Sequence, residues 1–402
     1  MGDSKFGWAW LPRELLDLIL DYVVEFPDYV RFCSVCTEWR LTALDEDNPG
    51  GGNHQLQKQR LCILKACGNK LPMLVFPTKD HSEDKRSFYS ITDGKIYDLP
   101  LPLPYGRRFF GSSHGWLFTI EKSMAITLVN PFSGKTILLP EFKDPWEDYQ
   151  LWLDNDEYER FPGKGILSSD PSLDPDSYQV AIIHLDVNNL ACFKSGEKDW
   201  NFLKVKKEYH FSDVVYHNGL LHGVDSRGTG ELVRVDDVTA GIETIIVPPR
   251  RNSEGIRTDY LVTTQEGDLL RVQRHLEDYD NEDDDWLKYR TSGFKVFKLA
   301  QEHSIEQVRQ KWTAIESIGD QALFLGDSNS ECVLASHFPG CKPNCIYYTE
   351  YYYNTYPFVP RGADDDVGMF NLETRTFGTH YVPDPAHMPL LPAIWIVPNL
   401  KG

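Results

Sequence analysis

The N-terminal part of the chain places apolar residues at helical spacing. Leu15, Ile19 and Val23 recur every four residues, a proline stands in front of them, and acidic residues occupy the first turns. Proline at the first position and acidic groups in the first turn favour the start of a helix. We therefore predict an amphipathic helix over residues 12–24. Further apolar positions at 30–39 predict one or two additional short helices.

After residue 69 the apolar residues form short runs instead. These runs are rich in β-branched and aromatic residues and are separated by Gly, Asp, Asn and Pro, a pattern typical of strands joined by turns. The clearest runs are Met73–Phe76, Trp116–Ile120, Ile126–Val129, Gln179–His184, Leu220–Val224 and Tyr260–Thr264. We therefore predict an all-β region over most of the chain.

A glycine-rich segment separates the two patterns. Residues 45–53 read DEDNPGGGN, a composition that favours a flexible linker. We predict a helical module at residues 8–46, a linker at 47–68 and a β-domain at 69–398. A helical module of this size cannot bury all of its own apolar surface. We therefore expect the β-domain or another protein to cover it.

Glycines that open apolar runs recur along the β-region. They are Gly115, Gly165, Gly219, Gly267, Gly319 and Gly368. A period of about fifty residues matches kelch-type propeller blades better than the shorter WD-type blades. We predict six or seven blades in a ring, which hides most strand edges. The predicted fold class is therefore mainly β, a kelch-like β-propeller with a small all-α N-terminal module.

The overall charge narrows the choice of partners. The 402 residues include 60 Asp and Glu against 41 Lys and Arg, a net charge of -19. This charge repels phosphate backbones and anionic lipid, so we expect neither nucleic acid nor a membrane as partner. We find no apolar run long enough to span a membrane and no secretory signal pattern. The eight cysteines are too sparse for a disulfide scaffold, and we expect a cytoplasmic or nuclear protein.

One N-terminal string is highly specific. It reads WLPRELLDLIL at residues 10–20 and VRFCSVCTEWR at 30–40. This string resembles the F-box, whose Leu-Pro turn and first helix bind a Skp-family adaptor that bridges to a cullin. The segment EFPDY at 25–29 departs from the commoner wording of that family. The alternative is a small helical subdomain that packs only on the β-domain.

The F-box resemblance assigns roles to individual residues. It implies an adaptor-facing role for Leu11, Pro12, Leu15, Leu16 and Ile19. It implies internal packing for Val35, Cys36 and Trp39. An undersized helical unit with an open apolar face is physically suited to docking on another protein.

The β-region carries a second resemblance. The strings are FFGSSHGWLF at 109–118, LVNPFSGKTILLP at 128–140, DVVYHNGLLHGVD at 213–225 and WTAIESIGDQALFLGDSNS at 312–330, extended by PGCKPNCIYYTE at 339–350 and GMFNLETRTF at 368–377. They look like the kelch-like propeller of plant F-box proteins, a domain without an assigned ligand. The two resemblances together imply the substrate-recognition subunit of an SCF-type (cullin-RING) ubiquitin ligase. Such a subunit has no catalytic residue and no cofactor, and here its protein substrate is unidentified.

Two other functions stay open. A propeller that binds a small molecule or acts as an enzyme, capped by the helices, would need convergent polar groups at one mouth. Candidate mouth residues are His114, His184, His217 and His222, although no nucleophile with a matching acid accompanies them. Alternatively, an F-box protein could bind the adaptor and sequester its partner without ubiquitination.

Several motifs that resemble metal or phosphate sites have simpler interpretations. Cys332, His337, Cys341 and Cys345 offer metal-binding side chains, but their spacing fits no zinc knuckle and strands would point them apart. We expect ordinary thiols there and no metal.

Three local features have equally simple interpretations. Cys33 and Cys36 are predicted to fill the helical core. The sequence Gly134-Lys135-Thr136 lacks the first glycine of a phosphate-binding loop, and we predict a β-turn. The acidic runs at 277–285 and 364–366 are predicted as solvated loops.

Overall fold

The computed structural model describes most of the chain. The described residues are 8, 11–20, 22–23, 26–33, 35–43, 72–77, 85–92, 94–101, 103, 107–142, 163–184, 189–203, 210–225, 231–237, 241–246, 257–279, 288–303, 308–326, 330–338, 340–350, 366–380 and 393–399. The predicted linker at 47–68 lies outside them. Within these ranges, no helix has the length and hydropathy required to cross a membrane.

Three short helices form the N-terminal module. They are α1 (Arg13–Leu20), α2 (Phe26–Cys33) and α3 (Thr37–Ala43). The carbonyl oxygen of Pro12 accepts hydrogen bonds from the amides of Leu15 and Leu16 at 3.0 and 3.2 Å, so the proline sets the start of α1 as predicted. This helix ends at Leu20 and is shorter than the predicted 12–24. The predicted apolar region at 30–39 is divided between α2 and α3.

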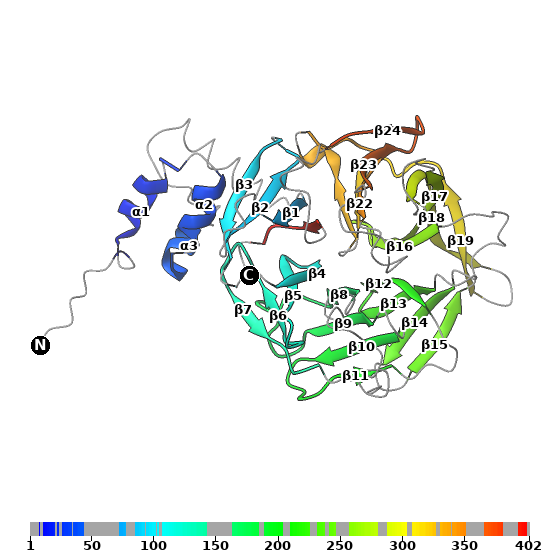
Figure 1. Ribbon diagram of the computed structural model, residues 1–402, viewed down its shortest axis with the longest axis horizontal. Coiled ribbons are helices and arrows are strands. Elements are labelled where there is room, and N and C mark those ends of the chain that lie inside the picture. Colours follow the sequence, from blue (N-terminus) through cyan, green and yellow to red (C-terminus); the bar gives the residue numbers. More distant parts are fainter. Residues whose placement is uncertain are drawn as a thin grey trace, which may run out of the picture.

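Six sheets follow the helices and form the blades of a β-propeller (Figure 1). Blade 1 contains β25 (Ile394–Ile396), β1 (Met73–Pro77), β2 (Lys85–Ser90) and β3 (Ile96–Pro100). Blade 2 contains β4 (Arg108–Ser113), β5 (Trp116–Ile120), β6 (Ile126–Val129) and β7 (Thr136–Leu138). Blade 3 contains β8 (Lys164–Leu167), β9 (Gln179–His184), β10 (Asn189–Lys194) and β11 (Asn201–Phe202).

Blades 4 to 6 complete the ring. Blade 4 contains β12 (Phe211–His217), β13 (Leu220–Asp225), β14 (Leu232–Asp237) and β15 (Gly241–Ile246). Blade 5 contains β16 (Arg257–Thr263), β17 (Leu269–Tyr279), β18 (Lys288–His303) and β19 (Val308–Ile315). Blade 6 contains β20 (Gln321–Leu325), β21 (Glu331–Leu334), β22 (Cys345–Glu350), β23 (Asp366–Asn371) and β24 (Thr376–Gly378). The predicted fold class is confirmed, with six blades.

The last strand closes the ring. β25 pairs antiparallel with β1, and Trp395 stands opposite Leu74. The buried indole N–H of Trp395 donates a hydrogen bond to the carbonyl oxygen of Leu325 at 3.1 Å, and its ring lies 5.1 Å from that of Phe324. Because both ends of the β-region share blade 1, the ring removes two strand edges that would otherwise be exposed.

Blade 6 departs from the simple strand order of the other blades. Its order is β21-β20-β22-β23-β24, with β20 and β22 parallel. Although β21 follows β20 in the chain, it lies at the inner edge, where it contacts β16 of blade 5. A 3-10 turn, η3 (Ala335–His337), follows β21 before the chain returns to β22.

Tight turns join the first two strands of blades 2 and 4. His114 and Gly115 have φ angles of 53° and 82°, and Asn218 and Gly219 have 51° and 76°. Two successive residues in the left-handed region form a type I′ hairpin turn, which is why glycine is favoured at the second position. Gly267 takes the corresponding place between β16 and β17, with φ 84°.

Both acidic runs differ from the prediction of solvated loops. β17 continues through Glu277, which forms an ion pair with Arg290 of β18 at 2.7 Å. Asp366 begins β23, and its carboxylate accepts hydrogen bonds from Arg274 at 2.7 Å and from the amide of Thr291 at 2.6 Å. The prediction is wrong for these residues, because their carboxylates pair with groups on neighbouring strands. The remaining members, 280–285 and 364–365, lie outside the described residues.

Candidate functional site

Helix α1 is apolar on two faces. Leu16 and Leu20 point into the module and are 2% exposed. Leu15, Leu18 and Tyr22 lie at spacings of three and four residues and are 45%, 54% and 84% exposed. Together with the exposed Pro12, these residues form the surface that we call the α1 stripe. A helix that is apolar on both sides needs a second partner to cover the outer side.

The inner face of α1 belongs to a core shared with the propeller. Leu16, Leu20 and the aromatic residues Tyr29, Phe32 and Trp39 form one buried cluster with residues of β1, β2, β4, β5 and β25. The indole N–H of Trp39 also donates a hydrogen bond to the carbonyl oxygen of Trp8 at 2.9 Å. Among the described residues, the module therefore packs on the ring through its inner side.

Arg40 of α3 links the module to the ring. Its Nε donates to the carbonyl oxygen of Cys33 at 3.0 Å, and its Nη2 donates to that of Ser133 at 3.1 Å. Ser133 belongs to the turn between β6 and β7 of blade 2. In Figure 1, α2 and α3 lie between α1 and the ring. The α1 stripe is therefore not covered by the described part of this chain.

The structure places the residues with implied adaptor roles in three environments. Pro12 and Leu15 are exposed, whereas Leu11 and Ile19 are half-buried against the shared core. Leu16 is buried in that core, so it supports the helix from inside and offers nothing to a partner. Leu18 and Tyr22 are also exposed beside Leu15. The sequence analysis did not name these two residues, although their spacing from Leu15 indicates the same face.

The residues with implied packing roles also divide. Trp39 is 8% exposed and its ring lies 4.6 Å from that of Phe32. Cys36 is half-buried against the same core, and Cys33 is fully buried. Val35 is 48% exposed, so the internal packing predicted for it is wrong in this chain. Val35 lies in the break between α2 and α3, where its side chain faces outward.

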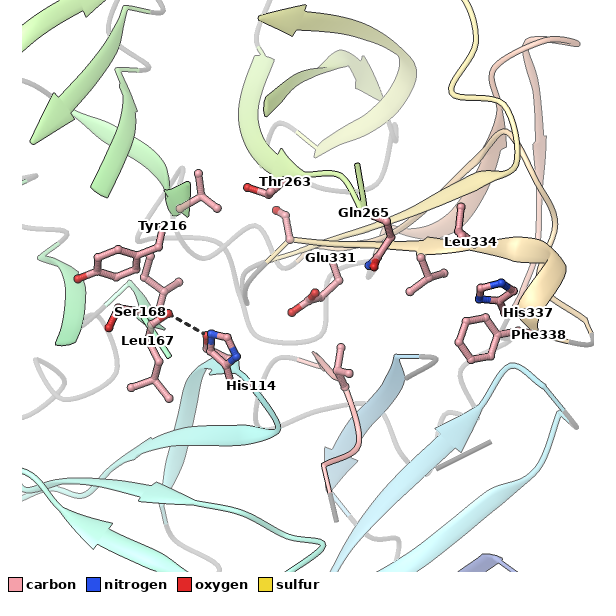
Figure 2. A pocket seen from close by; sticks show the side chains of 16 residues that line it. His114, Leu167, Ser168, Tyr216, Thr263, Gln265, Glu331, Leu334, His337 and Phe338 are labelled. Atoms are coloured by element: carbon pink, nitrogen blue, oxygen red, sulfur yellow. Dashed lines mark hydrogen bonds between the residues drawn. The ribbon is translucent and has the colours of Figure 1, made fainter. Parts of the chain in front are cut away.

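A cavity of about 560 Å³ lies inside the ring at the ends of the innermost strands. Its lining residues are Ser113, His114, Ile166, Leu167, Ser168, Val215, Tyr216, Thr263, Gln265, Ser330, Glu331, Val333, Leu334, His337, Phe338 and Val397. Every blade contributes to this axial cavity (Figure 2). Its volume is within the range of small-molecule and side-chain pockets.

Hydrogen bonds within the ring hold the polar wall in place. The hydroxyl oxygen of Ser168 accepts from the amide of Gln179 at 2.7 Å. The Nε2 of Gln265 donates to the carbonyl oxygen of Cys332 at 2.8 Å. Because these bonds restrict the side chains, the wall is largely preformed before any ligand binds.

A buried carboxylate supports the cavity wall and connects four blades. Asp213 of β12 forms an ion pair with Lys164 of β8, and both side chains are almost fully buried. Its Oδ2 accepts from the amide of Leu261 on β16 at 2.9 Å and from the hydroxyl of Ser330, beside β21, at 3.2 Å. A buried ion pair needs such additional donors to offset its desolvation.

Among the candidate histidines whose side chains the structure describes, His114 lines the cavity and His217 and His222 do not. The rings of His217 and His222 meet edge to face, with centroids 5.7 Å apart, beside the turn between β12 and β13. Burial lowers the pKa of His217, and nearby Asp268 partly offsets the shift. His184 ends β9, and its side chain lies outside the described residues. His337 was missed as a cavity residue, because only ring closure brings it to the axis.

The cysteine and histidine cluster near the C-terminal part is divided between two cores. Cys332 packs in the core shared by blades 5 and 6, whereas Cys345 and Cys341 pack on the opposite side of blade 6. Burial raises the pKa of both Cys332 and Cys341 to about 12. Across the described ranges, no three His, Cys, Asp or Glu side chains gather as metal ligands.

The turn predicted at Gly134-Lys135-Thr136 is confirmed. The amide of Gly134 donates to the carbonyl oxygen of Asn130 at 2.9 Å, and Gly134 has a φ of 73°. The side chain of Asn130 fixes the same turn, because its Oδ1 accepts from the amides of Phe132 and Ser133 at 2.9 and 3.0 Å. These bonds give the segment a structural role at the outer strands of blade 2.

Fold and site together define the class, a six-bladed β-propeller with a small helical module. A family model described as the KIB1-4 β-propeller matches residues 88–371. The chain belongs to this family. Relatives from Arabidopsis thaliana include F-box protein SKIP23, 23% identical over 98% of this chain and 97% of the relative, and F-box protein At2g26160, 23% identical over 86% and 96%. The resemblance to plant F-box proteins with a C-terminal propeller is therefore confirmed.

Solved structures overlap with the ring only loosely. Virginiamycin B lyase from Staphylococcus aureus is 14% identical, with a TM-score of 0.31 over 57% of this chain and 62% of the lyase. A quinonprotein alcohol dehydrogenase-like protein from Bacteroides thetaiotaomicron is 8% identical, with a TM-score of 0.34 over 81% and 78%. These TM-scores are too low to carry an argument about function.

Proposed function

We propose that this chain is the substrate-recognition subunit of an SCF-type ubiquitin ligase. The α1 stripe binds a Skp-family adaptor, which connects to a cullin, and the propeller binds the protein to be modified. The observation that carries the proposal is the position of Leu15, Leu18 and Tyr22, which stay exposed while the inner face of α1 is buried. The F-box names of the relatives support the same assignment.

The chain supplies proximity in this proposal and no catalytic group. Holding a target beside a ubiquitin carrier raises the effective concentration of its lysines, which replaces a bimolecular encounter with a local one. The ring suits a holding role, because its blades are joined by buried contacts and a closed strand order. A rigid scaffold keeps the distance between target and carrier within a narrow range.

Adaptor binding tests the proposal directly. The wild-type chain is mixed with purified Skp-family adaptor and compared with the double variant Leu15→Asp and Leu18→Asp. Two carboxylates in an apolar interface carry an uncompensated desolvation cost, so we expect recovery of the adaptor to fall at least tenfold. The matched control is Leu173→Asp, because Leu173 is 74% exposed in blade 3 and far from the helices in sequence.

Two outcomes contradict the proposal. One is equal recovery with the double variant and wild type, and the other is no recovery with either. Thermal unfolding followed by circular dichroism identifies variants that fail to fold.

A related function differs only in the fate of the target. The chain could bind the adaptor and sequester its partner without ubiquitination. Target half-life in cells separates the two, because an intact α1 stripe shortens it only if the target is degraded. A variant that carries Leu15→Asp and Leu18→Asp is the reference for that measurement.

A further inference from the structure

Residues 394–399 belong both to the seat of the helical module and to the wall of the axial cavity. We call them the closing strap. They comprise β25, which lies beside β1 (Figure 1), and residues 397–399. Successive side chains of a strand point to opposite faces of the sheet. The strap therefore packs against different parts of the protein within a few residues.

One face of the strap supports the helices. Ile394 and Ile396 are 1% and 0% exposed, and they belong to the same buried core as the inner residues of the module. Leu20 of α1 is one of these inner residues. The hydrogen bond from Arg40 to Ser133 is separate from this apolar core. The helices and the strap therefore stabilise each other through shared apolar packing.

The other face of the strap supports the cavity. Trp395 packs in one core with Val333 and Phe338, and both of these residues line the cavity. The carbonyl oxygen of Trp395 accepts a hydrogen bond from the hydroxyl of Ser112 in blade 2. Val397 lines the cavity itself. The strap is thus one part of the cavity wall and holds another part in place.

The last described residue of the strap fastens it to blades 2 and 3. The Nδ2 of Asn399 donates to the carbonyl oxygen of His114 at 2.9 Å and to the Oδ2 of Asp170 at 2.6 Å. The carbonyl oxygen of Asn399 accepts from the Nδ2 of Asn130 at 3.0 Å. Because His114 lines the cavity, this attachment also fixes a turn at the cavity wall.

We propose that the closing strap detaches and reattaches as one unit and thereby couples the helical module to the axial cavity. β25 pairs with β1 over three residues, so side-chain contacts supply much of its attachment. A short element of this kind can open while the blades stay folded. Loosening the helices removes support from Ile394 and Ile396, and the cavity wall then loosens with the strap.

The coupling gives the module a regulatory role beyond docking. A free energy of coupling between two sites acts equally in both directions. A protein that binds the α1 stripe and holds the helices in place therefore favours the attached strap and the ordered cavity wall. A ligand in the cavity favours the seated helices in the same way. The coupling between module and cavity does not depend on the identity of either partner.

Hydrogen exchange of the full chain, followed by mass spectrometry, tests the proposal. Leu20→Ala removes packing from the inner face of α1, and we expect severalfold faster exchange at residues 394–399 and at the cavity residues 330–338. The matched control is Leu18→Ala, the same change in the same helix at a residue that is 54% exposed. Residues 179–184 of blade 3 should keep their protection in both variants.

A second variant tests the opposite direction. Asn399→Ala removes the hydrogen bonds to His114 and Asp170 and leaves the helices unchanged in sequence. We expect severalfold faster exchange of the α1, α2 and α3 amides. Asn201→Ala is the control, because it removes a hydrogen bond to Glu197 at the surface of blade 3, and it should leave the helices protected.

Three outcomes overturn the proposal. One is unchanged exchange at residues 330–338 in Leu20→Ala, and another is unchanged exchange of the helices in Asn399→Ala, because the coupling must be reciprocal. The third is an equal rise in blade 3, which would indicate global destabilisation instead of release of the strap. These measurements need no adaptor, so they give the same answer whether or not the adaptor assay supports the proposed function.

Discussion

The helical module and the propeller ring use their apolar residues in different ways. In the ring, bulky residues such as Trp116, Trp312 and Trp395 are fully buried, because each blade packs against two neighbours. In the module, three helices of seven or eight residues have the ring on one side only, and the α1 stripe stays exposed. A closed ring can bury its bulky apolar residues between its own blades. A small appended module leaves apolar surface exposed that another protein can cover.

The largest expected effect is in the strand that closes the ring. Trp395→Ala removes a fully buried side chain together with its hydrogen bond to Leu325, and we expect a loss of about 4 kcal/mol in unfolding free energy. Urea unfolding followed by tryptophan fluorescence measures it. Leu173→Ala at an exposed position is the control and should change the free energy by less than about 0.5 kcal/mol. A small effect of Trp395→Ala would contradict the view that packing within the closed ring provides most of its stability.

The second effect concerns the ion pair beneath the cavity. Lys164→Met leaves the carboxylate of Asp213 buried without its cation, and we expect a loss of about 3 kcal/mol in unfolding free energy. The matched control is Lys298→Met, whose partner Asp268 lies 2.5 Å away at the surface and whose loss should cost less than about 1 kcal/mol. Equal effects at the two positions would contradict the view that burial determines how much the loss of an ion-pair partner destabilises the protein.

The third effect depends on pH. Burial between the rings of Tyr347 and Trp395 lowers the pKa of His380 to about 4, below the ordinary 6.5. Between pH 6.5 and pH 4, His380 is protonated in the unfolded chain but stays neutral in the folded chain. The free energy of unfolding therefore falls as the pH drops from 6.5 towards 4. We expect this residue to contribute a loss on the order of 2 kcal/mol over that window. In the variant His380→Phe, the free energy of unfolding in urea should differ less between pH 7 and pH 4.5 than in wild type. An unchanged difference would show that other groups cause the pH dependence.

The smallest effect is at the junction between module and ring. Arg40→Ala removes hydrogen bonds to the carbonyl oxygens of Cys33 and Ser133, with an expected local cost of about 1 kcal/mol. Hydrogen exchange of the α3 amides should rise severalfold while the blade amides keep their protection. Arg31→Ala is the control, since Arg31 pairs only at the surface, with Asp28 at 2.6 Å. Faster exchange throughout the ring would show that the module and the ring do not open independently.

The sequence predicts individual strands better than it predicts their order. The runs at 116–120, 126–129 and 179–184 coincide with β5, β6 and β9, because alternating side chains and turn residues act locally. Of the six glycines used as markers, Gly115, Gly219 and Gly267 occupy equivalent turns. Gly165 lies inside β8, where a side chain would meet Phe118. The reversed order of β20 and β21 leaves no such local signal.

The axial cavity could not be predicted from the sequence for a related reason. Its lining residues extend from Ser113 to Val397, and only closure of the ring brings them together. Glu331 in particular looks like an ordinary strand residue until β21 is placed at the axis. The α1 stripe was more accessible to prediction, since its residues are close in sequence and share one helical face.

The pairing of β25 with β1 also sets an order of events during synthesis. A ribosome releases the helices and most blades before residues 394–396 emerge, so blade 1 lacks its inner strand until those residues have been synthesised. Until then the edge of β1 is open, and the helices that pack beside it rest on an incomplete support. A premature stop codon shortly before β25 would therefore leave the helices and the preceding strands in place and still yield a chain that quality-control proteases degrade.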